Sequence, residues 1–148
     1  MIVPISFEDI YTIWSDHLWP NRISQIETNS AMSYWRGYDM KNMAYKPTFF
    51  AYMVDGAIAG VNSGHFCYED NFRSRGLFVF PEYRRRGIAK ELLQAAIDQA
   101  MIENAKFVWS FPKKESWSSY EAVGFRLVTC WEQAETGVNA YCRKDLRE

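Results

Sequence analysis

The sequence predicts an α/β fold (α+β in some schemes), with a mixed, mostly antiparallel sheet of six or seven strands and helices on both faces. The first supporting observation is the order of hydrophobic patterns along the 148 residues, β-α-α-β-β-β-α-β-α-β-β. The second is the Asp55-Gly56 dipeptide between two apolar runs, which is a strong hairpin signal. The third is the strand–helix–strand order after residue 74, which predicts a parallel pair in the same sheet. We expect residues 1–148 to form one domain.

The first 46 residues contain a short strand and two predicted helices. Residues 2–5 form the strand, and residues 8–19 form a helix because their apolar side chains share one stripe. Ser6 is the expected N-cap of this helix and Pro20 ends it. A second helix is predicted at residues 30–38.

The central segment carries three strands and the longest helix. Strands are predicted at residues 48–54, 57–68 and 74–80, with a turn at 69–71. Residues 86–103 form a helix, since their apolar side chains recur every three or four positions.

The C-terminal segment begins with a strand at residues 106–110 and a short helix at 115–123. A terminal hairpin of residues 126–133 and 138–144 completes the sheet, turning at residues 135–137.

Three cysteines, an odd number, do not form a disulfide framework, and we expect free thiols. In the predicted terminal hairpin, Cys130 and Cys142 would lie opposite each other.

The composition limits the classes of binding partner and the cellular location that we expect. The 17 basic and 18 acidic residues leave a net charge of −1, whereas a nucleic-acid-binding protein usually shows a basic excess. The longest apolar run, residues 49–54, is far shorter than the about 20 residues that cross a membrane. The N-terminal residues show neither a basic leader nor an apolar signal segment. We therefore expect a cytoplasmic protein with no membrane partner.

The segment between the strand at 74–80 and the following helix predicts an anion site. It reads Arg84-Arg85-Arg86-Gly87-Ile88-Ala89. Backbone N–H groups at a helix start have no intrahelical partner, and together with the helix dipole they attract anions. Gly87 allows a ligand to approach the backbone, and the arginines suit phosphate. The alternatives are a solvated basic corner or a contact with nucleic acid.

A second segment, Ser116-Trp117-Ser118-Ser119-Tyr120-Glu121-Ala122-Val123-Gly124-Phe125, places Ser116 and Tyr120 on one face of a helix. Tyr120 would then present its phenol near one end of the sheet. The alternative is a packing aromatic whose hydroxyl group faces water.

In this order and spacing, the two segments resemble the GNAT superfamily of N-acetyltransferases. Arg84 to Ala89 is similar to the family's (Gln/Arg)-x-x-Gly-x-(Gly/Ala) pyrophosphate loop, and Tyr120 to Phe125 resembles its Tyr-Glu-x-x-Gly-Phe signature. The clear resemblance covers residues 74–126.

The resemblance implies a GNAT-like domain that uses acetyl-CoA, or a related acyl-CoA, as donor, with no metal. It places the diphosphate on the backbone of residues 85–89 and pantetheine along the preceding strand. Tyr120 matches the residue that protonates the departing CoA thiolate, as a general acid. The implied cofactor-binding residues are Leu77, Phe78, Val79, Arg84, Arg85, Arg86, Gly87, Ile88, Ala89, Ser116 and Tyr120.

Two positions depart from the family pattern. Lys113 stands where many members have an asparagine that contacts pantetheine. The strand before the loop has no carboxylate to act as general base. Candidate bases on the preceding strand and turn are His65, Glu69 and Asp70, and water is the alternative.

The acceptor side of the predicted fold is rich in aromatic residues, within a chain that is 17% aromatic. Trp19, Trp35 and Tyr38 are the candidate acceptor-pocket residues, with core or dimer packing as the alternative. We expect transfer of an acetyl group to a primary amine, on a small molecule or a peptide, by direct attack in a ternary complex. The alternative function is an acyl-CoA-binding module, weak or inactive in catalysis, that acts as a sensor or partner protein. The family resemblance leaves homodimer formation open.

Overall fold

The fold is a seven-stranded mixed sheet, seen in a computed structural model that describes residues 1–29, 32–33, 37–38, 45–68 and 70–146. All neighbouring strands are antiparallel except the parallel pair β6–β7. The predicted fold class is therefore confirmed. The strands in sheet order are β1 (Ile2–Pro4), β4 (Thr48–Val54), β5 (Ala57–Cys67), β6 (Asn71–Val79), β7 (Phe107–Ser110), β11 (Cys142–Asp145) and β8 (Arg126–Leu127).

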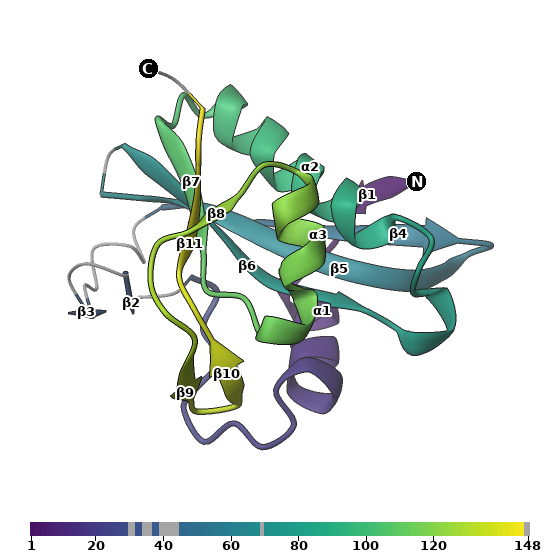
Figure 1. Cartoon of the computed structure of the whole chain (residues 1–148). Helices are drawn as coiled ribbons and strands as arrows, with labels where there is room; N and C mark the ends of the chain where they lie inside the picture. Colours follow the sequence, from purple (N-terminus) through teal and green to yellow (C-terminus); the bar gives the residue numbers. More distant parts are fainter. Residues whose placement is uncertain (30–31, 34–36, 39–44, 69, 147–148) are drawn as a thin grey trace.

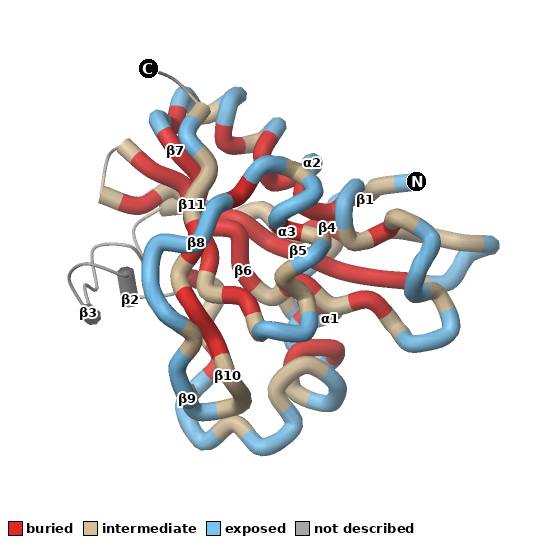
Figure 2. Tube along the Cα trace, in the orientation of Figure 1, coloured by how far each residue is buried: buried red, intermediate tan, exposed pale blue. Residues whose placement is uncertain are grey.

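Helices cover both faces of this sheet (Figure 1). On one face, α1 (Phe7–Ile13) continues as a π-helical turn, η1 (Trp14–Leu18). On the other face lie α2 (Ile88–Ile102) and the short α3 (Trp117–Ala122), which follows a 3₁₀ turn. The buried positions shown in red in Figure 2 run along the central strands between these two helical layers.

The start of the first helix follows the prediction. Ser6 is its N-cap, and the Ser6 hydroxyl oxygen accepts a hydrogen bond from the Asp9 N–H at 3.1 Å. Among the described residues, no helix is long and apolar enough to span a membrane.

The predicted helix at residues 30–38 is wrong. Its described residues form two short antiparallel strands, β2 (Met32–Ser33) and β3 (Gly37–Tyr38). Glycine, serine and the aromatic residues of this stretch are poor helix formers, and this preference outweighs the weak apolar spacing.

The predicted terminal hairpin forms, but its two arms pair in two separate ladders rather than in one. β8 pairs with β11, whereas β9 (Glu132–Ala134) pairs with β10 (Gly137–Asn139). The Tyr141 N–H donates to the Thr129 hydroxyl at 2.9 Å, so a side chain replaces the backbone partner and interrupts the ladder. Cys142 consequently lies opposite Leu127 rather than Cys130. All three cysteines are free, as expected.

The sheet splits between β6 and β7. These strands pair only where residues 71–73 face residues 107–109. Farther along β6 an extra residue forms a bulge, since Val61 lies opposite Phe78 while Ser63 lies opposite Arg75. A β-bulge bends its strand, which here separates β6 from β7.

Gly76 makes this bulge possible. Its φ of +81° is unfavourable for other residues, and a Cβ atom there would lie 2.3 Å from the Trp14 ring. The Trp14 Nε1–H donates a hydrogen bond to the Gly76 carbonyl at 2.8 Å. The helical layer of η1 is thereby joined to β6 at the point where the sheet opens.

Candidate active site

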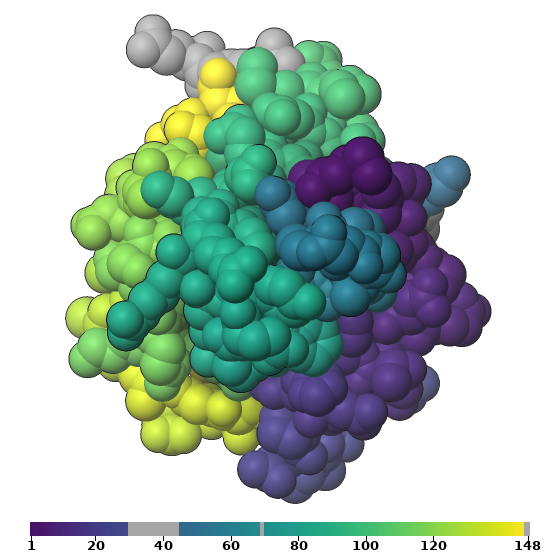
Figure 3. All heavy atoms as spheres, turned by 90° about the vertical axis from the view of Figure 1, so that its right-hand side faces the viewer, coloured from purple at the N-terminus to yellow at the C-terminus, as the bar shows by residue number. Residues whose placement is uncertain are grey.

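A cavity of about 990 Å³ lies at the opening of the sheet. Its walls come from the free edge of β6, the start of α2, the segment from residue 113 to α3, and the end of η1. On the face shown in Figure 3, the teal connection between β6 and α2 lies between the green α3 segment and the purple N-terminal segment. This volume is at the upper end of the range for small-molecule sites, roughly 300–1,000 Å³.

Most of the residues implied as cofactor-binding line this cavity. They are Leu77, Phe78, Val79, Arg84, Arg85, Gly87, Ala89 and Ser116. The side chains of the other two loop residues are elsewhere. Arg86 lies over the Tyr83 ring at 5.5 Å, and Ile88 is buried in the core under α2. The three consecutive arginines therefore do not form one uniform basic surface.

The start of α2 supplies unpaired backbone donors. Gly87 is the N-cap, has a φ of +79° and provides no side-chain cap. The first backbone hydrogen bond of the helix runs from the Glu91 N–H to the Gly87 carbonyl at 3.2 Å. The N–H groups of residues 88–90 precede this bond and have no acceptor within the helix. This end of the cavity therefore favours a negatively charged ligand.

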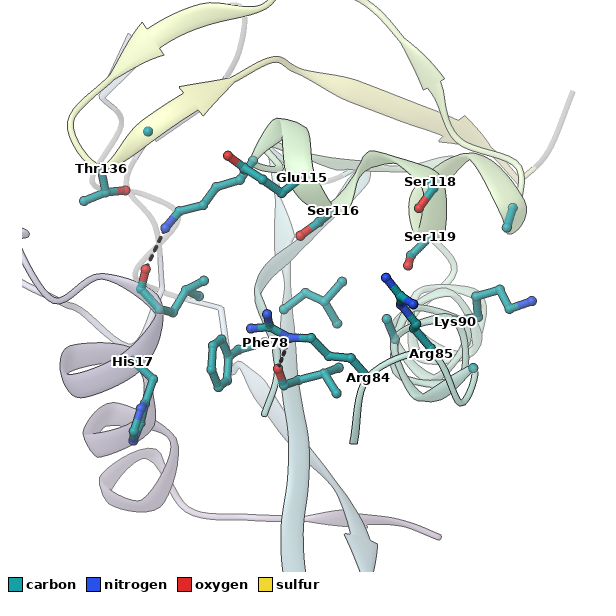
Figure 4. Close-up of a pocket in the computed structure, with 18 residues that line it drawn as sticks. His17, Phe78, Arg84, Arg85, Lys90, Glu115, Ser116, Ser118, Ser119 and Thr136 are labelled. Carbon is teal, nitrogen blue, oxygen red and sulfur yellow. Dashed lines mark hydrogen bonds between the residues drawn. The ribbon is translucent and has the colours of Figure 1, made fainter. Parts of the chain in front are cut away.

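Charged side chains strengthen that preference. Arg85 and Lys90 line the cavity near the helix start, and the serines of α3 point toward them in Figure 4. Arg84 folds back instead, and its Nε–H donates to the Val79 carbonyl at 2.8 Å. Glu115 is the one carboxylate among the described lining residues.

A second, smaller cavity of about 50 Å³ adjoins the first. The two share Leu18, Leu77, Lys113 and Ser116 as lining residues. The Lys113 Nζ donates to the Leu18 carbonyl at 2.7 Å, which is one of the dashed lines in Figure 4, and burial lowers the Lys113 pKa. Lys113 thus links η1 to the segment before α3 at the boundary between the cavities.

Tyr120 lines the small cavity. Its side chain is buried, and its ring packs edge-on against Phe125 with centroids 5.4 Å apart. The Ser110 hydroxyl donates to the Ser74 carbonyl at 2.6 Å and lies 3.5 Å from the Tyr120 hydroxyl. Burial raises the Tyr120 pKa above its ordinary value of 10, so the phenol stays protonated at neutral pH.

Neither His65 nor Asp70, the two candidate bases in the described part of the chain, is among the residues that line the two cavities. His65 is fully buried in β5, with its Nδ1 3.4 Å from the Cys67 Sγ. Burial, followed by the charge of Arg73, lowers the His65 pKa to about 3, which makes the ring a weak proton acceptor. Asp70 accepts a hydrogen bond from the Asn71 side chain at 2.6 Å. Glu69 lies outside the described residues.

One of the three predicted acceptor-pocket residues lines the small cavity. The Trp19 ring lies there, 5.2 Å from the Trp14 ring. Trp35 and the side chain of Tyr38 lie outside the described part of the structure.

The structure adds lining residues that the sequence did not single out. His17 stacks on Phe78 at 5.8 Å at the rim of the large cavity, although its helical spacing indicated only an apolar stripe. Arg73 and Arg75 line the small cavity. Their alternation on β6 was the available signal, because residues two apart in a strand share a face.

A sequence-family comparison identifies the chain. The model of the acetyltransferase (GNAT) family matches residues 10–125. The chain belongs to the GNAT acetyltransferase family. The predicted family and the enzyme class are thereby confirmed, and GNAT enzymes use acyl-CoA to acetylate amine acceptors. A comparison with curated protein sequences gives no significant match.

Solved structures with the same fold include several acetyltransferases. The IAA acetyltransferase from Bacillus cereus has a TM-score of 0.73 and 16% identity, with 99% of each chain covered. The ribosomal-protein-S18-alanine N-acetyltransferase from Escherichia coli has a TM-score of 0.64 and 14% identity, covering 100% of this chain and 94% of that one. The PaiA N-acetyltransferase from Thermoplasma acidophilum, in complex with coenzyme A, has a TM-score of 0.58 and 15% identity, covering 72% and 65%. At these low sequence identities, the similarity shows a shared fold and no more.

Proposed function

We propose that this GNAT enzyme transfers an acetyl group from acetyl-CoA to a primary amine by direct attack in a ternary complex, and that residues 1–148 act as one domain. One observation carries the proposal. The large cavity is lined by cations and by the helix start with its unpaired N–H groups, and it shares lining residues with the small cavity that Tyr120 lines. A long anionic thioester fits this arrangement, with its diphosphate at α2 and its acyl end near Tyr120.

The free edge of β6 is the proposed guide for pantetheine. Leu77, Phe78 and Val79 line the large cavity on the part of β6 that has no strand partner at β7. A peptide-like arm can hydrogen-bond to such an edge as an added strand would. The same strand N–H groups can polarise the thioester carbonyl.

The proposed chemistry forms a C–N bond and breaks the C–S bond. The amine lone pair attacks the thioester carbonyl carbon, and the C–S electron pair leaves with sulfur. The Tyr120 hydroxyl group donates its proton to the departing thiolate. The proton that the attacking nitrogen loses as the amide forms passes through water to the Tyr120 phenolate and restores the phenol. Because burial keeps this phenol protonated, the donor is present throughout the neutral pH range.

The acceptor must lose a proton to become a nucleophile. Among the described residues lining the small cavity, none is an aspartate, glutamate or histidine, whereas Arg73, Arg75 and Lys113 are cationic. Nearby cations disfavour an ammonium group and so favour the neutral amine. Water is the proposed proton acceptor.

The test is an acetyl-CoA assay with a panel of primary amines, followed by thiol release and by mass spectrometry of the product. Tyr120→Phe should lower kcat at least about tenfold and leave acetyl-CoA affinity within about twofold, since it removes only the proton donor. Tyr11→Phe, at an exposed position on α1, is the matched control and should keep the wild-type kcat. Equal kcat values for the two variants would refute the acid role of Tyr120, and acetyl-CoA binding without any acetylated amine would refute the proposed transfer.

A further inference from the structure

The small cavity combines strong positive charge with burial. Its described lining residues include Arg73, Arg75 and Lys113 but no carboxylate. The two ion pairs among the described residues, Arg126–Asp145 and Arg143–Asp145, involve other arginines. Buried cations are normally paired with anions, because removing a charge from water is costly. This cavity therefore has the charge of a site for an anionic group.

Arg73 lines this cavity and has an unused hydrogen-bond donor. Its side chain is 7% exposed, and its Nε has no hydrogen-bond partner in the described part of the chain. The guanidinium lies over the Trp109 ring, 4.8 Å from its centroid, which fixes the plane of the group. A fixed, planar guanidinium is suited to a carboxylate.

Arg75 is anchored beside it. Its Nη1 donates to the Glu27 carbonyl at 2.8 Å, and its guanidinium lies 4.9 Å from the Trp14 ring and 5.3 Å from the Trp19 ring. These contacts hold the guanidinium of Arg75, which lines the same cavity as Arg73.

Asn139 supplies the complementary group. Its Nδ2 donates to the Phe111 carbonyl at 2.8 Å, which identifies the other amide atom as oxygen. This Oδ1 is buried and has no hydrogen-bond partner among the described residues. The lining of one small cavity therefore includes a cation with an unpaired donor and a neutral amide with an unpaired acceptor.

From this arrangement we propose that the small cavity holds the reacting end of the acceptor and selects an amine that carries a carboxylate close to the nitrogen, as in a free amino acid. The inference rests on the proposed acetyl transfer. The carboxylate binds Arg73, and an amine N–H donates to the Asn139 Oδ1. Tyr120 lines the same cavity, so the amine would sit beside the thioester.

The size and charge of the small cavity favour an amine that carries a carboxylate over other classes of ligand. A volume of about 50 Å³ suits a carboxylate and its neighbouring amine rather than a nucleotide phosphate. A polycationic acceptor would meet three like charges. An acceptor that carries a carboxylate instead brings a group of the opposite charge.

The experiment compares free amino acids with their carboxamides, in pairs that have the same side chain and nearly the same size but differ in the negative charge. We expect kcat/KM to favour the carboxylate by at least about tenfold, since a hydrogen bond to a charged group is worth that much. The comparison is conservative, because the carboxamide has the more easily deprotonated amine. Calorimetric titration of the same pairs in the presence of CoA should show the same preference in Kd.

The Arg73→Gln variant tests whether Arg73 binds the carboxylate of the acceptor. It should raise the KM of the preferred amino acid at least about tenfold, bring the carboxylate and carboxamide values within about threefold of each other, and leave the acetyl-CoA KM unchanged. Arg126→Gln, on the exposed surface of β8, is the control and should keep the wild-type preference. If Arg73→Gln does not fold, the wild-type comparison decides.

The outcomes separate the two proposals. Wild-type enzyme that binds or acetylates carboxamides as well as it does amino acids would overturn the acceptor proposal alone. If acetyl-CoA is neither bound nor consumed, the proposed transfer fails, while the calorimetric preference still supports or overturns carboxylate binding in the small cavity.

Discussion

Replacing Gly76 with alanine should destabilise the fold by about 2–5 kcal/mol. The left-handed φ of +81° costs an alanine roughly 1–2 kcal/mol. The new Cβ would lie 2.3 Å from the Trp14 indole, and such overpacking costs roughly 1–3 kcal/mol. For a chain of this length, the sum corresponds to a Tm lower by about 6–15 °C.

Gly56→Ala is a matched control for the backbone term. Gly56 has nearly the same φ, +80°, but a Cβ there would meet no atom within 4 Å. Thermal and urea unfolding of both variants should show a clearly larger loss for Gly76→Ala. Equal losses would refute the argument that contact with Trp14 requires glycine at this bulge.

Three further predictions concern other parts of the chain. Ala89→Trp places a large side chain in the large cavity over the first turn of α2. It should raise the acetyl-CoA Kd, measured by calorimetry, at least about tenfold and leave the Tm of the unliganded protein nearly unchanged. An unaltered Kd would mean that the donor binds elsewhere. The backbone N–H groups of residues 23–24 and the Ser24 hydroxyl group donate hydrogen bonds to Glu135 and hold its pKa below the ordinary value of 4.5. Ionised Glu135 therefore stabilises the fold above pH 4.5, and this stabilisation is lost as the pH falls through the lowered pKa. Urea midpoints of Glu135→Gln should therefore fall less steeply than wild type below pH 4.5, and parallel curves would contradict this. Cys130 is exposed and the other two thiols are buried, so a thiol reagent should titrate one cysteine in the native protein and three after unfolding; three fast thiols in the native state would disagree with the fold.

Much of the fold could be predicted because its signals are local. Asp55-Gly56 forms the predicted hairpin between β4 and β5, and the apolar stripe at residues 86–103 corresponds to α2. The sequence-based predictions failed where tertiary contacts determine the local structure. No local pattern shows that Thr129 takes a backbone partner and interrupts the terminal ladder.

The site was predictable to a similar extent. The motif around Gly87 predicted an anion site, and the structure places unpaired helix N–H groups and cations there. The sequence could not show that Arg73 and Asn139, distant along the chain, line one small cavity. The candidate base His65 had a suitable ordinary pKa, but its burial depends on strand packing that periodicity alone does not give.

Thermal unfolding with and without acetyl-CoA tests the central claim most directly. Acetyl-CoA at 100 times its Kd should stabilise the folded chain by about 2.7 kcal/mol, which corresponds to a rise in Tm of roughly 5–10 °C. The account predicts this rise for the wild-type chain. For Ala89→Trp at the same acetyl-CoA concentration, a tenfold weaker Kd reduces the rise to about half, and a still weaker Kd reduces it further. An unchanged Tm for the wild type with acetyl-CoA and with other acyl-CoA donors would contradict it.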